Sequence, residues 1–420
     1  MHRSRSKAIF YVVLATALWT PEFALADQPL TLTLREVMAL ALKYNPGVAA
    51  SQAQHQAARA GERTAAAYPN PVVEAGAGPA FYKDGREGVD SNWGAGVLQP
   101  IDYPALRGYR IRGAQAGTGV AQAGLQVFQI NLLAEVKAAF YDIIRRKEER
   151  QIASEDLTLL EQVRARVKVR VETGEAPKYE LIKADAELLN AQKTLQSADL
   201  RVAQARAILA RLIGPAFRDE FEVAGDLTAP RELPSLGDLR EEVLARNPVM
   251  AQSRAEQVRA RAKLNLEREL SIPQMAIRAG VDRDPDFQNW RFGVALVVPV
   301  WNRREGPIAE AAAGISQVDA QTEQRKLGLL RDLDTAYNYY LINLSMVSAY
   351  ESGLLAQAEA ALNVAGAAYR FGERGILDYL DAQRIYRHVR LDYLNARYEL
   401  QRSLIEIERL RASDSPGELP

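Results

Sequence analysis

Four short segments alternate between apolar and polar residues with the period of two that is typical of β-strands. We expect strands at about 71–80, 92–100, 273–282 and 291–299, joined in pairs by polar loops. In the clearest of them, apolar side chains share one face: Met275, Ile277, Ala279 and Val281. Alternation over about nine residues is typical of membrane strands and also of a soluble hairpin with one wet face. The strands alone leave both interpretations open.

Each strand pair precedes a very long helical segment. Leu106–Val171 and Ile308–Phe371 contain no proline and are rich in Ala, Gln, Glu, Arg and Leu. Each would extend roughly 100 Å at about 1.5 Å per residue. Gly174 and Gly372 end these helices, because glycine readily adopts the left-handed conformation of a helix C-terminus. The pattern predicts long helical hairpins at about 105–212 and 306–410.

The two sets of elements form a duplication. The segment 34–60 returns as 236–262 with ten of its 27 residues identical, including Asn45-Pro46 and Asn247-Pro248. A repeat of about 200 residues is too long for a solenoid and corresponds to a whole structural half. We expect a first repeat at 27–225, a linker at 226–235, a second repeat at 236–411 and a disordered tail at 412–420.

The first 26 residues carry the features of a secretory signal peptide. Arg3, Arg5 and Lys7 precede a 12-residue apolar run at 8–19, and Ala24-Leu25-Ala26 forms a small-residue cleavage signal. The apolar run is too short to span a membrane. The chain has no cysteine, which excludes disulfides and a lipid anchor on an N-terminal cysteine. The sequence therefore predicts an exported protein.

Charge and candidate chemistry exclude several function classes. The chain has 53 basic and 53 acidic residues, so there is no nucleic-acid footprint. Its three histidines are isolated, which with the lack of cysteine argues against a metal site. No nucleophile elbow, P-loop or dinucleotide fingerprint stands in a strand–turn–helix context. We expect no enzyme, no cofactor and no resident metal.

The number of strands has a consequence if they span a membrane. Four strands cannot close a barrel, and an open sheet edge cannot exist in lipid. Two chains would supply eight strands, whose barrel interior is filled by side chains, whereas three would supply twelve and leave a lumen. Strand number thus favours a trimer. The helices are charged along their length, so we expect them to project into the periplasm.

The helical turn at 369–383 (YRFGERGILDYLDAQ) resembles the corresponding turn of the TolC-like outer membrane efflux factors, and 173–181 (TGEAPKYEL) is its weaker partner. Segments 99–102 (QPID) and 299–306 (PVWNRREG) resemble the CzcC-type branch, which is associated with heavy-metal efflux. The resemblance implies an α+β membrane protein, a homotrimer that forms a 12-stranded β-barrel in the outer membrane of a Gram-negative bacterium. A periplasmic α-helical barrel would continue it.

The resemblance also assigns a periplasmic gate to five residues. Tyr369 and Arg374 match positions that hold the tip closed, and Glu180 falls where the family has an aspartate. Asp378 and Asp381 lie one helical turn apart on the same face, so a trimer would place six carboxylates around one axis. Such a ring would attract cations. The ordinary structural explanation is that acidic residues near a helix start complement the helix dipole.

Further roles follow from the same resemblance. The helix turns at Gly174, Glu175, Gly372 and Glu373 would dock a periplasmic adaptor, although the glycines also serve as simple helix ends. Pro100 and Pro299 would mark the junctions between barrel and helices, or would only terminate strands.

The implied function is the outer membrane channel of a tripartite efflux system. Its partners would be an adaptor (a membrane fusion protein), an RND-type inner-membrane pump and outer membrane lipid. Heavy-metal cations are the expected substrate, with drugs or organic solutes, or a type I secretion duct, as alternatives. A periplasmic coiled-coil adaptor is a distant alternative, because it leaves the alternating strands of each half unexplained.

Overall fold

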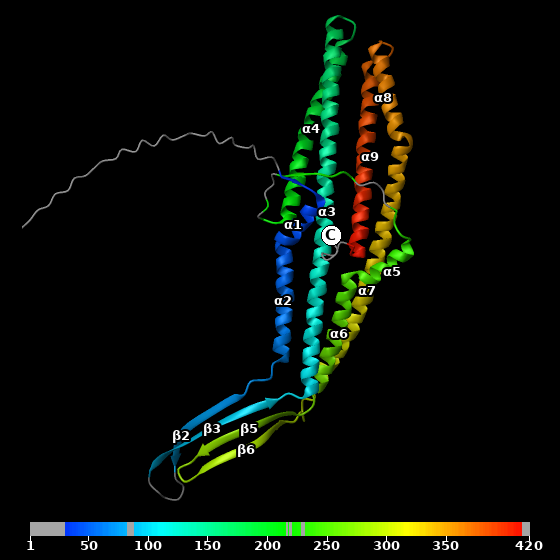
Figure 1. Cartoon of the computed structure of the whole chain (residues 1–420). Coiled ribbons are helices and arrows are strands. Elements are labelled where there is room, and N and C mark those ends of the chain that lie inside the picture. Colours follow the sequence, from blue (N-terminus) through cyan, green and yellow to red (C-terminus); the bar gives the residue numbers. More distant parts are fainter. Residues whose placement is uncertain (1–29, 82–87, 216, 218–220, 228–231, 414–420) are drawn as a thin grey trace, which may run out of the picture.

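The computed structural model describes residues 30–81, 88–215, 217, 221–227 and 232–413. Figure 1 shows an elongated bundle of helices with a sheet at one end and two helical turns at the other. The expected signal peptide and the tail beyond Ser413 lie outside the described residues. No helix in the described ranges is long and apolar enough to cross a membrane.

Both halves begin with a helix pair of the same construction. The pairs are α1 (Leu34–Tyr44) with α2 (Pro46–Ala66), and α5 (Leu236–Arg246) with α6 (Pro248–Glu269). An asparagine caps the second helix of each pair, and proline follows it, where a missing N–H costs nothing.

The two capping asparagines also tie each pair to the rest of its half. Asn45 Nδ2 donates to Leu212 O at 2.7 Å and Asn247 Nδ2 donates to Leu410 O at 2.8 Å. This repeated contact gives the duplication seen in the sequence a structural counterpart.

Each half contributes one hairpin to a four-stranded antiparallel sheet of order β2-β3-β5-β6. The strands are β2 (Val72–Phe81), β3 (Val89–Ile101), β5 (Gln274–Arg283) and β6 (Gln288–Val297), each displaced by one to three residues from the expected bounds. The halves meet at β3–β5, where Gly94 opposes Asp282 and Gly96 opposes Gly280. Within the chain, β2 and β6 are the edges. A short parallel pair, β1 (Leu30–Leu32) and β4 (Phe221–Val223), lies away from this sheet.

The helical hairpin of the first half is uninterrupted. Helix α3 runs over 69 residues (Pro104–Glu172) and returns as α4 (Lys178–Ile213). The middle of α3 packs with α1, the end of α4 and part of α9 around a core that includes the fully buried Leu133 and Ile143.

The second half differs from the sequence expectation of one continuous helix. Helix α7 (Glu305–Ala349) stops at a π-helical turn, η1 (Tyr350–Leu354), and continues as α8 (Leu355–Arg370) before α9 (Ile376–Arg411) returns. Gly353 has a non-helical backbone, and Ser352 hydroxyl donates to Ala349 O at 3.2 Å. Serine and glycine together weaken the helical ladder.

Side chains of α9 hold this turn. Tyr393 hydroxyl donates to Glu351 at 2.8 Å, and its ring lies 5.9 Å from that of Tyr350.

The expected linker also differs from a free connection. Leu227 is buried, and its carbonyl accepts a hydrogen bond from Arg397 at 2.8 Å. Leu233 packs against the core of the second half, around Leu239 and Leu333. The described part of the segment is held because its leucines cover the ends of both helical cores.

Candidate functional site

Two turns with the same backbone geometry close the helical hairpins at the end far from the sheet (Figure 1). Gly174 has φ 81° and Gly372 has φ 76°, both in the left-handed region. Glu175 N donates to Arg170 O at 2.8 Å, and Glu373 N donates to Ala368 O at 2.9 Å. These bonds satisfy carbonyls that a helix end leaves free.

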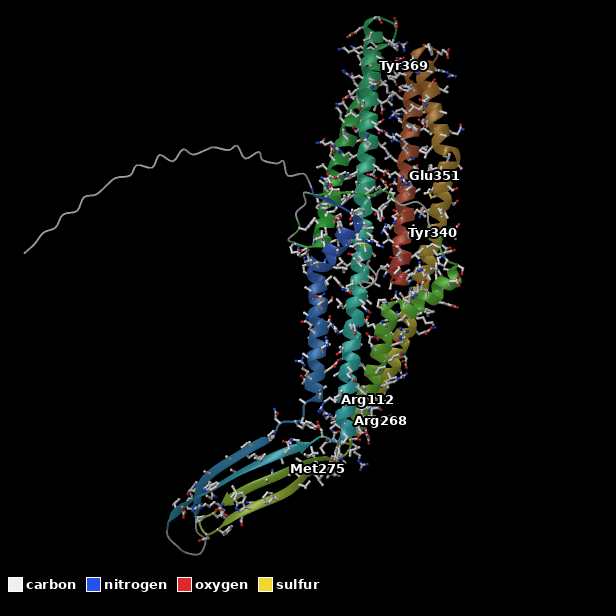
Figure 2. All side chains as sticks on the ribbon, in the orientation of Figure 1. Arg112, Arg268, Met275, Tyr340, Glu351 and Tyr369 are labelled. Carbon is white, nitrogen blue, oxygen red and sulfur yellow. The ribbon has the colours of Figure 1, made fainter. Side chains whose placement is uncertain are left out.

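Tyr369 lies inside the contact between the two hairpins. Figure 2 labels it near their free ends, and its side chain is buried with 4% exposure. Its ring stacks on Tyr379 at 5.9 Å with 2° between the planes, and the Arg170 guanidinium lies 5.3 Å from its centroid. Gly366 permits this stack, since a Cβ there would come within 3.0 Å of the Tyr379 ring.

The surrounding cluster is apolar and joins four helices. It contains Leu160, Val163, Val167, Ala184, Ala191, Tyr369, Ile376 and Leu380. We call this set the tip cluster. It lies between the turns and the larger cores of the two halves, so it is the last apolar contact before the free ends.

Two polar atoms are left unpaired beside the tip cluster. The Tyr369 hydroxyl and Glu180 Oε2 are buried and have no hydrogen-bond partner among the described residues. Burial raises the pKa of Tyr369, and the adjacent Arg170, through a weak polar contact with the hydroxyl that falls short of a hydrogen bond and through its positive charge, partly offsets that effect. An unpaired buried polar group costs about 1–3 kcal/mol. Both groups lie at the level of the tip cluster, near the free ends of the hairpins.

The remaining predicted gate residues lie at the surface. Arg374, in the turn before α9, contacts Asp378 in the first turn of α9 at 3.5 Å, with side-chain exposures of 71% and 55%. No ion pair among the described residues joins Arg374 to Glu180. Asp381 is exposed on the same face as Asp378. Exposed pairs of this kind contribute about 0–1 kcal/mol.

The predicted docking residues also lie at the surface. Gly174, Glu175, Gly372 and Glu373 are all exposed, and Arg170 approaches Glu175 at 3.9 Å. Phe371, between Tyr369 and Gly372 in the second turn, is an apolar residue with 81% exposure. Both turns are thus free of intrachain cover.

At the other end of the molecule, one face of the sheet is apolar and exposed. Trp290, Phe292, Val294 and Leu296 alternate along β6 with exposures of 70%, 79%, 61% and 58%. The opposite face carries a 600 Å³ hollow with charged and glycine residues in its wall, Glu74, Gly94, Asp282 and Arg291 among them. The Arg291 guanidinium pairs with the Asp282 carboxylate at 2.5 Å on this face.

The two predicted junction prolines differ in position. Pro100 does not terminate its strand: β3 continues to Ile101, and Pro100 opposes Ala276 of β5. Pairing with β2 has already ended at Leu98, so no donor is required on that side. Pro299 follows the end of β6 and precedes Arg304, which caps α7 with φ 61° and pairs with Glu267.

Sequence reasoning missed Arg170, Tyr379 and Gly366 around the tip cluster. Arg170 stands four residues before Gly174, in the last turn of α3, where a cation suits the helix dipole. Its position at a helix end could have identified Arg170 from the sequence. The stacking of Tyr379 on Tyr369 carries no short-range sequence pattern, since the two residues lie on different helices.

Among the described residues, no group of three or more His, Cys, Asp or Glu side chains is arranged to hold a metal ion. Two ends with different chemistry result: an exposed apolar sheet and a partly polar helical tip.

Comparisons with known proteins agree with this architecture. The chain is 25% identical over 413 residues to the cobalt-zinc-cadmium resistance protein CzcC of Cupriavidus metallidurans, covering 94% of this chain and 97% of that protein. It is 24% identical over 309 residues to the pyoverdine export outer membrane protein OpmQ of Pseudomonas aeruginosa, covering 71% and 65%. The crystal structure of CusC superimposes with a TM-score of 0.79 at 18% identity, covering 91% of this chain and 93% of that one.

A family model described as outer membrane efflux protein matches residues 37–215 and 239–412. The two matched segments correspond to the two structural halves, each with its helix pair, strand hairpin and helical hairpin. The chain therefore belongs to the outer membrane efflux protein family.

Proposed function

We propose that three copies of this outer membrane efflux channel subunit close one 12-stranded barrel and continue it as a helical tunnel. The observation that carries the proposal is the sheet: four strands with two unpaired edges, β2 and β6, and one exposed apolar face. An open edge cannot persist in lipid, so β6 of one copy pairs with β2 of the next. The apolar face meets lipid, and the face with Asp282 and Arg291 lines the lumen.

Cysteine cross-linking tests this arrangement, because the chain has no native cysteine. Val73→Cys on β2 and Val294→Cys on β6 place thiols on both edges, on the apolar face. A bis-maleimide should yield a covalent trimer from outer membranes and nothing larger. A ladder of higher oligomers, or monomers alone, would contradict closure by three copies.

The helical tips form the gate in this proposal. The buried but unpaired Tyr369 hydroxyl and Glu180 carboxylate oxygen support it, since a neighbouring copy can supply the missing partners. Exposed Arg374 reaches across to such a neighbour at little cost, because its present contact with Asp378 is long and solvated. Asp378 and Asp381 from three copies line the opening.

Single-channel conductance tests the gate. Arg374→Ala and Tyr369→Phe should each raise the conductance of the purified protein in a planar bilayer, because each removes a contact that holds the tips together. Arg331→Ala is a matched control: Arg331 is an exposed arginine paired with Asp332, outside the tips. Unchanged conductance for both tip variants would exclude these residues from the gate.

The proposed substrates are divalent heavy-metal cations. The match to a cobalt-zinc-cadmium resistance protein over 94% of the chain supports this, and the acidic pair Asp378–Asp381 suits cations. The match to a pyoverdine exporter covers 71% of the chain and keeps organic solutes as the alternative. Deletion of the gene should lower tolerance to cobalt, zinc or cadmium. Unchanged metal tolerance with lost export of an organic solute would favour the alternative.

The proposed partners are a periplasmic adaptor and an inner-membrane pump of the RND type. The two equivalent turns offer docking points, with exposed Phe371 as an apolar contact beside Gly372 and Glu373. Phe371→Asp should abolish co-purification with the adaptor and leave the trimer intact. Retained co-purification would show that the adaptor docks at a site other than the Phe371 turn.

A further inference from the structure

A single acidic residue interrupts the apolar stripe by which α3 faces the second hairpin. Ile152, Leu160, Val163 and Val167 follow one another at helical spacing and are all buried. Asp156 stands in the same stripe between Ile152 and Leu160 and is also buried, with 7% exposure. A carboxylate at such a position requires partners.

The partners come from α9, whose own stripe is interrupted at the same level. Arg387 Nη1 donates to Asp156 Oδ2 at 2.8 Å, and Gln383 Nε2 donates to Asp156 Oδ1. Towards the tip, α9 presents the buried Ile376 and Leu380. We call Asp156, Gln383 and Arg387 the buried polar cluster.

The buried polar cluster divides two apolar regions. Ile152 and Leu394 belong to the large core of the first half, whereas Leu160 and Leu380 belong to the tip cluster. Contact between α3 and α9 is therefore apolar, then polar for about one helical turn, then apolar again. The tip cluster is a separate, smaller unit beyond the polar layer.

Two more ion pairs flank this layer but are more exposed. Arg390 Nη1 meets Glu155 at 2.6 Å with exposures of 29% and 44%, and Arg384 meets Glu187 of α4. Solvated pairs contribute little. Asp156, with 5% side-chain exposure against 13% for Glu187 and 44% for Glu155, is the carboxylate that loses most water when the hairpins meet.

At Asp156, the cost of removing the carboxylate from water exceeds the stabilisation that Arg387 provides. Burial raises the pKa of the Asp156 carboxyl, and the hydrogen bond and positive charge of Arg387 offset this only in part. A buried ion pair whose desolvation exceeds its attraction is weaker than an apolar contact of the same size. The contact between the hairpins is thus weakened at this level.

The π-helical turn adds a point of bending close by. Glu351 of η1 contacts Tyr393, six residues beyond Arg387 on α9. A hollow of 380 Å³ lies at the same level between α3, α8 and α9, lined by Ile152, Leu355, Tyr386 and Arg390 among others. Single π-turns inside helices often occur at functional sites. The buried polar cluster, the hollow and the π-helical turn therefore lie at the same level of the hairpins.

We propose that Asp156 is a positioning residue that acts as a release point. With Gln383 and Arg387 it keeps the contact between the hairpins weak, so that the ends of α8 and α9 leave α3 while the large cores stay packed. The residues that move include Tyr369, Asp378 and Asp381, so the inference rests on the proposed gate and concerns its regulation.

A single reporter thiol measures the separation. Val163→Cys is a small change in the tip cluster, and maleimide reacts with it when the hairpins part, in an otherwise cysteine-free chain. Its labelling rate follows the population of the open form. All variants are made in this background and measured on the assembled protein in detergent or lipid.

The release point predicts effects of opposite sign. Arg387→Met leaves the Asp156 carboxylate buried and unpaired, so labelling should be about tenfold faster. The triple change Asp156→Leu, Gln383→Leu and Arg387→Met replaces the polar layer by apolar side chains. Labelling should then be about tenfold slower than in the Val163→Cys parent. If the buried polar cluster instead strengthened the contact between the hairpins, labelling would be faster in both the Arg387→Met variant and the triple variant.

A milder variant guards against misfolding. Asp156→Asn keeps an acceptor for Gln383 and removes the charge that is most buried. Because Arg387 is 24% exposed and can still be hydrated, labelling should be slower than in the parent. Arg150→Met is the matched control, because Arg150 pairs with Asp199 at 2.5 Å within the first hairpin, away from the reporter thiol, and its loss should leave the rate unchanged. Faster labelling of both Asp156→Asn and the triple variant would overturn the proposal.

Conductance separates this inference from the gate. If labelling changes as expected while conductance is the same in all variants, the release point stands and the tips are not the gate. If Arg374→Ala opens the channel but labelling of the triple variant is not slowed, the gate stands and the release point is wrong.

Discussion

The two helical hairpins share an ancestry and differ in construction. In the first, α3 is one helix of 69 residues; in the second, α7 is interrupted at Tyr350–Leu354 before α8 completes the hairpin. Their turns at Gly174 and Gly372 have nearly the same backbone angles and hydrogen bonds. The duplication therefore supplied the same scaffold twice, and the irregular helix arose on the side that carries Tyr369 and Arg374. A rigid hairpin next to one that bends suits a channel that must open.

The difference is confined to the distal half of the hairpins. Nearer the sheet lie two larger cores: one around Leu133 and Ile143, to which α9 adds Leu394 and Tyr398, and one around Leu239 and Leu333 within the second half. Motion of α8 and α9 beyond the π-turn can leave these cores intact. Substitutions in the cores and turns, and a change of pH, test whether the two hairpins differ only beyond the π-turn.

The largest effect should come from the two cores, and it should be equal. Ile143 of α3 and Leu333 of α7 are both fully buried. Ile143→Ala and Leu333→Ala should each lower the free energy of unfolding by about 2–5 kcal/mol, because each leaves a cavity. Denaturant titration measures it. A cost near zero for Leu333→Ala alone would mean that the second half is loose throughout, and not only beyond its π-turn.

The two turns should respond alike to loss of their glycine. No atom lies within 4 Å of a Cβ added at Gly174 or Gly372, so the left-handed backbone alone sets the cost. Gly174→Ala and Gly372→Ala should each destabilise by about 1–2 kcal/mol. Thermal unfolding of both variants beside Gly117→Ala, a helical glycine with open space around it, gives the comparison. A large effect at only one turn would show that the turns are not equivalent.

The smallest effect concerns pH. Burial raises the pKa of Asp156, with Arg387 opposing and Glu187 adding to the shift. The stabilisation linked to this group is therefore greatest at acidic pH and is lost as pH rises through the raised pKa. As pH falls from neutral through the raised pKa of Asp156, labelling of Val163→Cys should slow relative to the same thiol in Asp156→Asn.

Comparison of the two proteins at each pH removes the thiol's own pH dependence. Glu155 limits the window on the acid side: its hydrogen bonds with Gln151 and Arg390 lower its pKa, so stability is lost there as pH falls. A labelling ratio independent of pH would remove Asp156 as a titrating group.

The sequence predicted the elements whose signal is local. Alternation at Met275–Val281 marked a strand, and Gly174 and Gly372 marked helix ends, because backbone geometry there depends on the residue itself. The family resemblance located Tyr369 in the second turn, and the structure buries it. Asn45 and Asn247 marked the same joint twice, and the structure gives both the same long-range hydrogen bond.

Features that depend on distant partners were beyond reach. In the sequence, Asp156 looks like an ordinary exposed acidic residue of a helix. Its carboxylate is buried because α9 packs on it and supplies Gln383 and Arg387, more than 220 residues away. The π-turn depends on Tyr393 of another helix. Pro100 was expected to end β3, but β2 ends first and so removes the need for an N–H. In each case, packing between elements decided the outcome.

Ion selectivity of the reconstituted channel tests whether three copies form a conduit whose narrowest point is lined by Asp378 and Asp381. The reversal potential in a KCl gradient should show preference for cations. Asp378→Asn with Asp381→Asn should abolish most of it, whereas Glu175→Gln in the first turn should leave it unchanged. Selectivity that is absent in the parent, or equal in all three proteins, would contradict the account.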